Sequence, residues 1–157
     1  SEVVIGRPDV AAVVMLRRDP DPLATQVVLV REFRSAARNA RGMVLELPSG
    51  SSFDDSLPPL QVAAEEVHEE TGLRVDAARL RAVGSRQVAA TLLGHHAQLY
   101  TLELRDEELA WLVAHEGEQR GAGGSERTYV EVRRLDGLLA SDELDWSTLG
   151  MILAVVR

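Results

Sequence analysis

The chain has 157 residues, 45% of them hydrophobic and 27% charged, a composition typical of one globular domain with its own core. Its net charge of -8 argues against nonspecific binding to nucleic acid or to an anionic membrane, because both need a basic surface. The lack of cysteine excludes disulfides, thiolate metal sites and cysteine nucleophiles. No apolar run is long enough to span a bilayer. We expect a cytoplasmic protein, with a removed organellar targeting segment as the alternative.

Apolar runs rich in β-branched residues predict strands, and apolar residues at helical spacing predict helices. Strands interrupted by a few helices predict a single domain over residues 1–157, of the α/β (α+β) class, with a mixed sheet and helices packed on its faces. A glycine-rich loop, expected to be mobile, follows the second helix at 116–126. In chain order we expect strands at 10–16, 26–33 and 43–47, a helix at 58–71, strands at 80–88 and 98–104, a helix at 106–115, a strand at 128–133 and a helix at 145–156.

The predicted helix at 58–71 carries four glutamates in two adjacent pairs. Each residue advances about 100° around a helix, so Glu66 and Glu70 stack one turn apart beside the apolar stripe. Glu69 lies close to them on the solvent side, whereas Glu65 points away. Three of the four carboxylates can therefore converge on one cation, and oxygen-only ligands suit Mg²⁺ first and Mn²⁺ second. A solvated acidic face is the alternative, although the helix dipole disfavours anions in the last turn.

The segments "LELPSG" (45–50) and "EEVHEETGL" (65–73) resemble the Nudix box, with the lead-in of the ADP-ribose and nucleoside-diphosphate-sugar pyrophosphatases. The segment "VVLVREFR" (27–34) is similar to the strand that precedes the box in this subgroup. The resemblance implies a Nudix-type α/β/α sandwich whose last strand is followed by two closing helices. It also implies a Mg²⁺-dependent pyrophosphohydrolase that converts a nucleotide sugar of the ADP-ribose, ADP-glucose or UDP-glucose class to nucleoside monophosphate and sugar phosphate. A homodimer is expected from the same resemblance.

The resemblance assigns the metal to side chains of the box and to one backbone group. Glu66 and Glu70, with Glu69, would hold Mg²⁺. The backbone carbonyl of Ser49 would join them.

Further assignments concern the substrate and the base that activates water. Arg34, Arg31 and Gly50 occupy positions that contact substrate in the subgroup, although surface charge on an edge strand is the alternative for Arg31. The general base comes from a late loop, where Glu126 is the first candidate and Glu118 and Glu116 are the next. A simply solvated side chain is the alternative for Glu126.

Two positions depart from the family pattern. The arginine that precedes the first glutamate of the helix is Glu65 here, and Leu57 stands where the upstream glutamate belongs. Another arginine, such as Arg86, would have to replace the missing one through space. The second interpretation is therefore a catalytically weakened Nudix fold that serves as a binding or scaffold subunit. Cleavage of RNA ends is disfavoured, because the chain has no basic groove.

Histidine and tryptophan residues have plainer interpretations. His95 and His96 are expected in a hairpin loop and not as a metal-binding pair, because adjacent residues of a strand point to opposite faces. Trp111 and Trp146 are expected to pack in the interior, with base-stacking platforms as the alternative.

Overall fold

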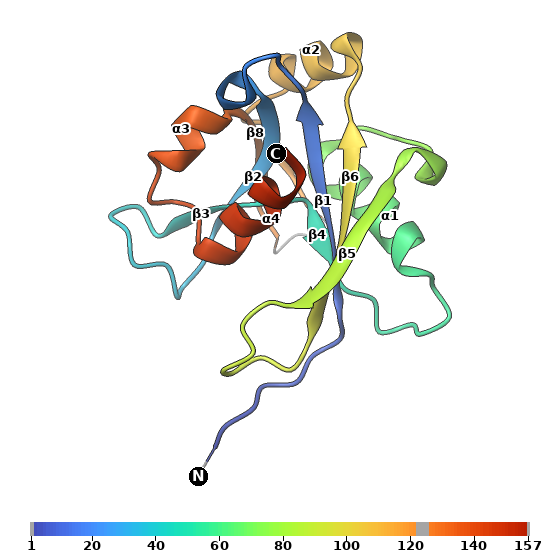
Figure 1. Ribbon diagram of the computed structural model, residues 1–157, viewed down its shortest axis with the longest axis vertical. Coiled ribbons are helices and arrows are strands. Elements are labelled where there is room, and N and C mark those ends of the chain that lie inside the picture. The colour runs from blue at the N-terminus through green and yellow to red at the C-terminus, as the bar shows by residue number, and fades with distance from the viewer. Residues whose placement is uncertain (1, 122–125, 157) are drawn as a thin grey trace.

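The computed structural model describes residues 2–121 and 126–156, which form one mixed sheet flanked by helices (Figure 1). This confirms the expected mixture of helices and strands. The strands are β1 (Val10–Arg17), β2 (Gln26–Phe33), β3 (Met43–Glu46), β4 (Ser49–Gly50), β5 (Arg81–Gln87), β6 (His96–Glu103), β7 (Gln119–Arg120) and β8 (Thr128–Arg134). The helices are α1 (Pro59–Thr71), α2 (Asp106–Ala114), α3 (Leu135–Leu139) and α4 (Trp146–Val156), with short 3-10 turns η1 (Pro22–Ala24) and η2 (Ala77–Arg79).

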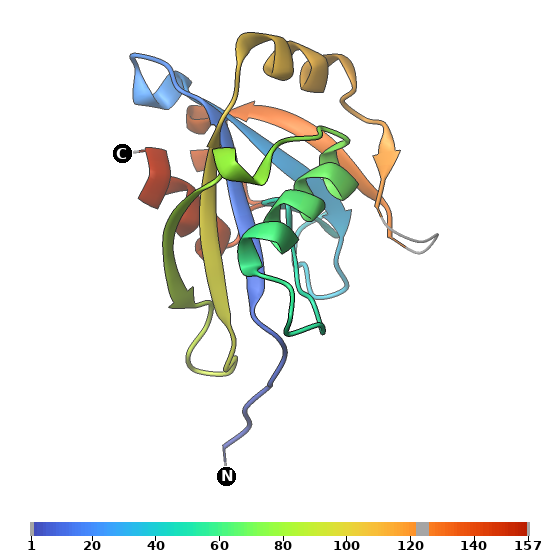
Figure 2. The same ribbon diagram turned by 90° about the vertical axis from the view of Figure 1, so that its right-hand side faces the viewer.

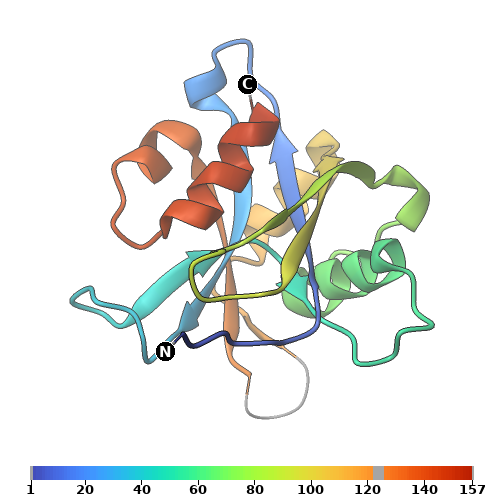
Figure 3. The ribbon, with the colours of Figure 1, turned by 60° about the horizontal axis from the view of Figure 1, so that its bottom comes forward.

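The sheet divides at its centre, and this division places the candidate site. The strand order is β5-β6-β1-β2-β8-β7, and of these neighbours only β1 and β6 run parallel. Strands β1 and β2 pair only over 15–17 and 26–28. Beyond that point β4 pairs with the start of β1 and β3 pairs with the end of β2. The chain from β3 to β4 therefore crosses the middle of the molecule on its way to α1 (Figure 3).

Two apolar cores lie on opposite faces of the sheet. Alternate residues of β1 and β2 supply each core, because successive side chains of a strand point to opposite faces. Helices α1 and α2 cover one face, whereas α3 and α4 cover the other (Figure 2). The expected pair of closing helices is thus present. Across residues 2–121 and 126–156, no helix has both the length and the apolar character that crossing a bilayer requires.

Helix α1 begins and ends where the sequence predicts. Proline at its first position needs no N–H partner there, and Gly72 caps the end with a left-handed φ of 79°. The buried residues are Val62, Ala63, Val67 and Thr71, and Leu60 and Ala64 pack against the same core. This apolar stripe leaves Glu66 and Glu70 at the edge of the core.

The prediction that both tryptophans pack in the interior is wrong for Trp146, which is 87% exposed at the start of α4. Trp111 packs against the core under α1 and stacks on His115 with ring centroids 4.1 Å apart. The guanidinium of Arg120 lies 5.6 Å from the Trp111 ring. A tryptophan in an amphipathic pattern can face either side of a helix end, and the first turn of α4 turns this one outward.

Arg31 does not lie on an edge strand, and this expectation is wrong because β2 runs between β1 and β8. Its guanidinium binds Glu131 of β8 with both carboxylate oxygens, at 2.7 and 3.0 Å, and also contacts Glu143 between α3 and α4. The side chain of Arg31 is only 12% exposed. Arg31 has the strand parity of Val27 and Leu29, so it lies on the face covered by α3 and α4, opposite α1. Its role as a substrate contact stays a prediction.

We expect Arg31→Ala to lower the free energy of unfolding by roughly 3 kcal/mol, because Glu131 and Glu143 would face each other without their shared cation. Urea unfolding followed by circular dichroism measures the effect. Arg134→Ala is the matched control, since Arg134 pairs with Asp136 on the open surface, and it should change stability little. Equal losses in the two variants would contradict the bridging role of Arg31.

Candidate functional site

Helix α1 presents its glutamates as the helical geometry predicts. Glu66 and Glu70 are partly buried beside the core, whereas Glu65 and Glu69 are exposed. Glu65 points away from the pair and accepts a 3.4 Å hydrogen bond from Gln61. Glu69 lies at the rim, where it lines a surface cavity with His68 and Arg74. Its part in holding a metal stays a prediction, while Glu66 and Glu70 form the centre of the site.

The short strand β4 holds the two inner carboxylates by its backbone. The N–H of Ser49 donates a 3.2 Å hydrogen bond to Glu70 Oε2. Gly50 lies directly against Glu66, since a Cβ at this position would overlap the Glu66 carboxylate. A side chain at position 50 would therefore displace the carboxylate from its present position. The structure thus gives Ser49 and Gly50 contacts with the acidic side chains, and their predicted contacts with metal and substrate stay predictions.

Two further glutamates from the sheet lie close to this pair, and the sequence analysis missed both. Along β2, the side chain of Glu32 points to the same face of the sheet as those of Val28 and Val30. This is the face that α1 covers. Glu46 pairs with Val30 across β2 and β3. The only available signal was an acidic residue at an inward position of a strand, which is unusual unless the residue is paired or functional.

Arg34 supplies the positive charge of the site. Its Nε and Nη2 bind the two carboxylate oxygens of Glu46 at 3.0 and 2.9 Å, and Nη2 lies 3.0 Å from Glu32. The hydrogen bond to Glu46 is the first cause that raises the pKa of Arg34. The negative charge of Glu70 also raises it. Arg86, the expected substitute for the missing arginine of the helix, is instead on β5 and faces α4. That expectation is wrong. Arg34 is the arginine beside the acidic cluster, which consists of Glu32, Glu46, Glu66 and Glu70.

Burial and mutual repulsion dominate the electrostatics of the carboxylates. Burial is the first cause that raises the pKa of Glu70 to about 9, followed by the charge of Glu66, while the N–H of Ser49 opposes the shift. Burial likewise raises the pKa of Glu66 to about 7, followed by the charges of Glu69 and Glu126. Burial also raises the pKa of Glu32. Each proton held in this way is one that a divalent cation can replace.

The donor set fits a hard divalent cation, because it consists of carboxylates and offers no sulfur. Glu66 and Glu70 are two acids whose charge is poorly compensated by the protein around them. In the described parts of the chain, no group of three or more histidine, aspartate and glutamate side chains is arranged to hold a metal ion. The site thus offers a partial set of ligands. Mg²⁺ commonly completes such a set with water and with substrate phosphate.

Of the three candidate bases in the late loop, Glu126 is the one that faces the cluster. It is exposed, and its charge acts on both Glu66 and Glu32. Glu116 instead accepts a 2.6 Å hydrogen bond from the N–H of Val132, and Glu118 pairs with Arg120. The predicted glycine-rich loop contains β7, and its residues 122–125 lie outside the described part of the chain.

A cavity of about 210 Å³ adjoins the acidic cluster. Arg7, Arg34, Glu46, Ser49 and Gly50 form part of its polar wall, and Arg7 also donates a 3.3 Å hydrogen bond to Ser51. The cavity thus presents guanidinium groups that suit phosphate oxygens. Glu66 and Glu70 do not line it, but they contact Ser49 and Gly50 of its wall.

His95 lies in the loop between β5 and β6, as predicted, but it is only 5% exposed and lines the same cavity. Burial is the first cause that lowers the pKa of His95, and the charge of Arg7 adds to it, while the charge of Asp9 opposes the shift. Its Nδ1 is buried and has no hydrogen-bond partner within the described residues. His96, by contrast, begins β6 and donates its backbone N–H to Asp9. No periodicity in the sequence distinguishes the two histidines.

Metal-free protein should lose stability as the pH rises from about 5 to 9. Folding raises the pKa of Glu66 to about 7 and of Glu70 to about 9, so the folded state binds more protons than the unfolded state throughout this window. The stability that the protonated carboxyl groups contribute is complete below their unfolded pKa, near 4.5. It is lost as the pH rises through the folded pKa of each group. Urea unfolding in EDTA at a series of pH values measures the slope.

In the variant Glu70→Gln, the free energy of unfolding should change less with pH above pH 7. In Glu66→Gln, it should change less with pH below pH 7. Glu65→Gln is the control on the same helix, and its slope should match that of the parent protein because the side chain is exposed. Stability that rises with pH across the window would contradict the assignment.

Comparison with models of protein families finds no matching family, and comparison with curated protein sequences finds no match either. The arrangement of Glu66, Glu70, Arg34 and the adjoining cavity therefore carries the functional argument.

Proposed function

We propose that the protein is a Mg²⁺-dependent pyrophosphohydrolase of the Nudix type, which cleaves a nucleoside-diphosphate sugar to nucleoside monophosphate and sugar phosphate. One observation carries the proposal. Two partly buried carboxylates, Glu66 and Glu70, are held by the backbone of β4 beside a cavity lined by Arg7 and Arg34. The resemblance of "LELPSG" and "EEVHEETGL" to the Nudix box supports the same function, as does the placement of helices on both faces of a mixed sheet.

Each group of the site has a part in this reaction. Glu66 and Glu70 would hold Mg²⁺, with Glu69 at the rim, and the bound ion supplies charge neutralisation and a more acidic water. Arg34 and Arg7 bind non-bridging oxygens of the diphosphate, for which a planar guanidinium is well suited. Glu126 accepts a proton from the attacking water. The water oxygen forms a bond to one phosphorus while the bridging P–O bond breaks, and the bridging oxygen leaves on the other phosphate.

In this proposal Arg34 takes the place of the usual arginine of the box. In the family this arginine sits on the helix and holds the catalytic glutamates by charge, but Glu65 occupies its position and is exposed. Arg34 reaches the cluster from the end of β2 and is bound by Glu46 and Glu32. It is thus fixed beside Glu70 by two carboxylates.

A weakened, non-catalytic scaffold is the second candidate function. The observation that favours it is the combination of the exposed Glu65 with the absence of a complete ligand set in the described residues. In this case the same cavity would bind a nucleotide sugar without turnover.

Hydrolysis of ADP-ribose, ADP-glucose, UDP-glucose and a nucleoside triphosphate, assayed with Mg²⁺ by released monophosphate, tests the proposal. We expect turnover of a diphosphate sugar. Glu66→Gln and Glu70→Gln should each lower kcat/KM at least about 100-fold, because a metal ion supplies several kcal/mol to such a step and each 1.36 kcal/mol is tenfold. Glu65→Gln should retain most of the activity, since it faces away from the pair. A folded sample without turnover in Mg²⁺ or Mn²⁺ would favour the scaffold.

The variant Glu126→Gln should lower kcat by about 100-fold or more with little change in KM, as expected for loss of a general base. Glu118→Gln is the matched control in the same loop, because Glu118 pairs with Arg120. Loss of activity in the Glu118 variant alone would move the base to that residue.

A further inference from the structure

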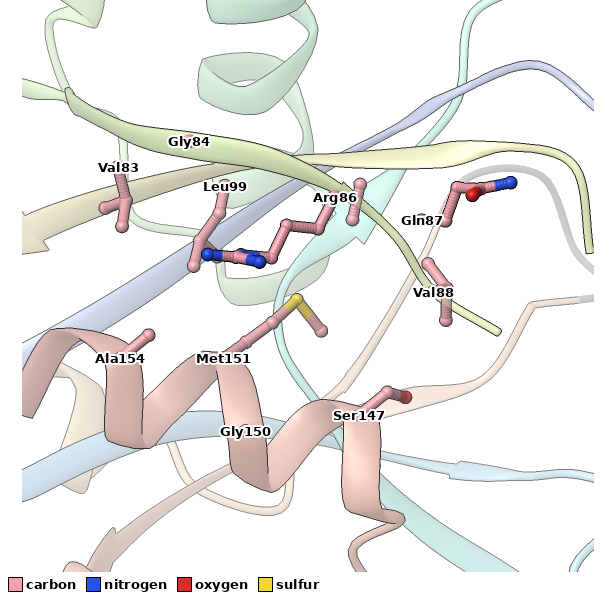
Figure 4. A pocket seen from close by; sticks show the side chains of 11 residues that line it. Val83, Gly84, Arg86, Gln87, Val88, Leu99, Ser147, Gly150, Met151 and Ala154 are labelled. Carbon is pink, nitrogen blue, oxygen red and sulfur yellow. The ribbon is translucent and has the colours of Figure 1, made fainter. Parts of the chain in front are cut away.

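A second chamber, of about 420 Å³, lies between β5 and α4. Every residue of β5 is exposed, so no further element of the described chain covers this strand. Figure 4 shows the side chains that line the chamber on both sides. Most of the wall is apolar, formed by Val83, Val88, Leu99, Met151 and Ala154.

Arg86 is the charged residue of this apolar chamber. Its side chain projects from β5 into the space above α4, on the side of Met151 and Ala154 (Figure 4). The backbone of Arg86 pairs with β6, but no hydrogen bond or ion pair joins its side chain to another residue of the described chain. Arg31 and Arg34, by contrast, are each bound by carboxylates. A free, planar guanidinium over an apolar wall is suited to stack on a flat heteroaromatic ring.

The chamber adjoins the polar cavity that Ser49 and Gly50 line. Val88, Ala97 and Met151 line both, so the two spaces share part of their walls, and together they are called the trough. One end of the trough carries Arg34 and Gly50, and the other carries Arg86. A ligand that fills its length must place phosphates at the first end and a flat, weakly polar group at the second.

We propose that this chamber binds the heteroaromatic base of a nucleotide, with the guanidinium of Arg86 stacked on the base. The orientation of the ligand rests on the proposed function, which places the diphosphate in the polar cavity. The base itself is assigned from the apolar wall and the unpaired arginine of the chamber. The substrate is then a nucleoside diphosphate derivative that is held by its nucleoside half.

Binding of AMP, GMP, CMP and UMP, measured by NMR titration in EDTA, tests the proposal without catalysis. At least one monophosphate should bind, and Arg86→Ala should weaken its binding about tenfold or more, the usual effect of losing a stacking partner. Arg81→Ala is the matched control on the same strand, because Arg81 lines a different cavity with Arg18 and Arg79. Its Kd should equal that of the parent protein.

Filling the chamber provides a second variant that should not harm folding. Gly150 lies in α4 on the chamber wall, and a Cβ added there meets nothing within 4 Å. Gly150→Leu should therefore abolish nucleotide binding while the Tm stays equal or rises, because leucine favours a helix over glycine. Gly137→Leu in α3 is the control, since its Cβ position is equally open and it does not line the chamber.

The outcomes separate this proposal from the proposed function. Nucleotide binding that is lost in the Arg86 and Gly150 variants supports the chamber even if no diphosphate is hydrolysed. Hydrolysis with an unchanged KM in both variants would overturn the assignment of the chamber to the base. The proposed hydrolase activity would still hold. Failure of all four monophosphates to bind at millimolar concentration would also overturn it. So would a second copy of the chain seated in the groove, seen as a dimer that Gly150→Leu dissociates.

Discussion

The close approach of the β4 backbone to α1 is the constraint on which the site depends. Ser49 donates its N–H to Glu70, and Gly50 leaves no room for a side chain beside Glu66. This contact exists because β1 and β2 separate after their short pairing and admit β4 at the start of β1. The core positions of β1 and α1 then fix the depth at which the two carboxylates lie. A change in any of these elements would shift the acids relative to the cavity.

Holding acids at this depth opposes folding. The raised pKa values of Glu66 and Glu70 mean that burial of their charged forms costs free energy that the rest of the core must offset. Elsewhere the chain pairs its buried acids, as Glu108 with Arg79 and Glu131 with Arg31. The pair on α1 is the exception to this pattern. Such local departures from the rules of stable folding are typical of functional sites, where a ligand supplies the missing charge.

Much of the fold follows from local patterns in the sequence. The apolar runs located β1, β2 and β8 to within a residue or so, and helical spacing with Gly72 located α1. The two-residue strands β4 and β7 have no periodicity, so they could not be predicted. They exist because their neighbours in space offer free backbone groups, which is a property of the tertiary structure.

The candidate site was predictable only where a single helix sets it. Helical geometry placed Glu66 and Glu70 together and turned Glu65 away, as the structure shows. Glu32, Glu46 and His95 reach the site from three separate elements, and no spacing along the chain relates them. Arg31 and Arg86 were misplaced for the same reason, since the face on which a strand residue emerges depends on which strands become its neighbours.

The parallel pairing of β1 with β6 has a consequence for how the site forms during folding. Ser49 of β4 and Glu70 of α1 are only 21 residues apart, so the contact that holds the carboxylate requires only a short loop to close. The wall formed by β6 comes from much farther along the chain, as the contact of Thr101 with Val14 across 87 residues shows. Contacts of such separation form slowly, because a long loop must be closed first. The wall of the apolar chamber therefore depends on contacts of much greater sequence separation than the contact that holds the carboxylates.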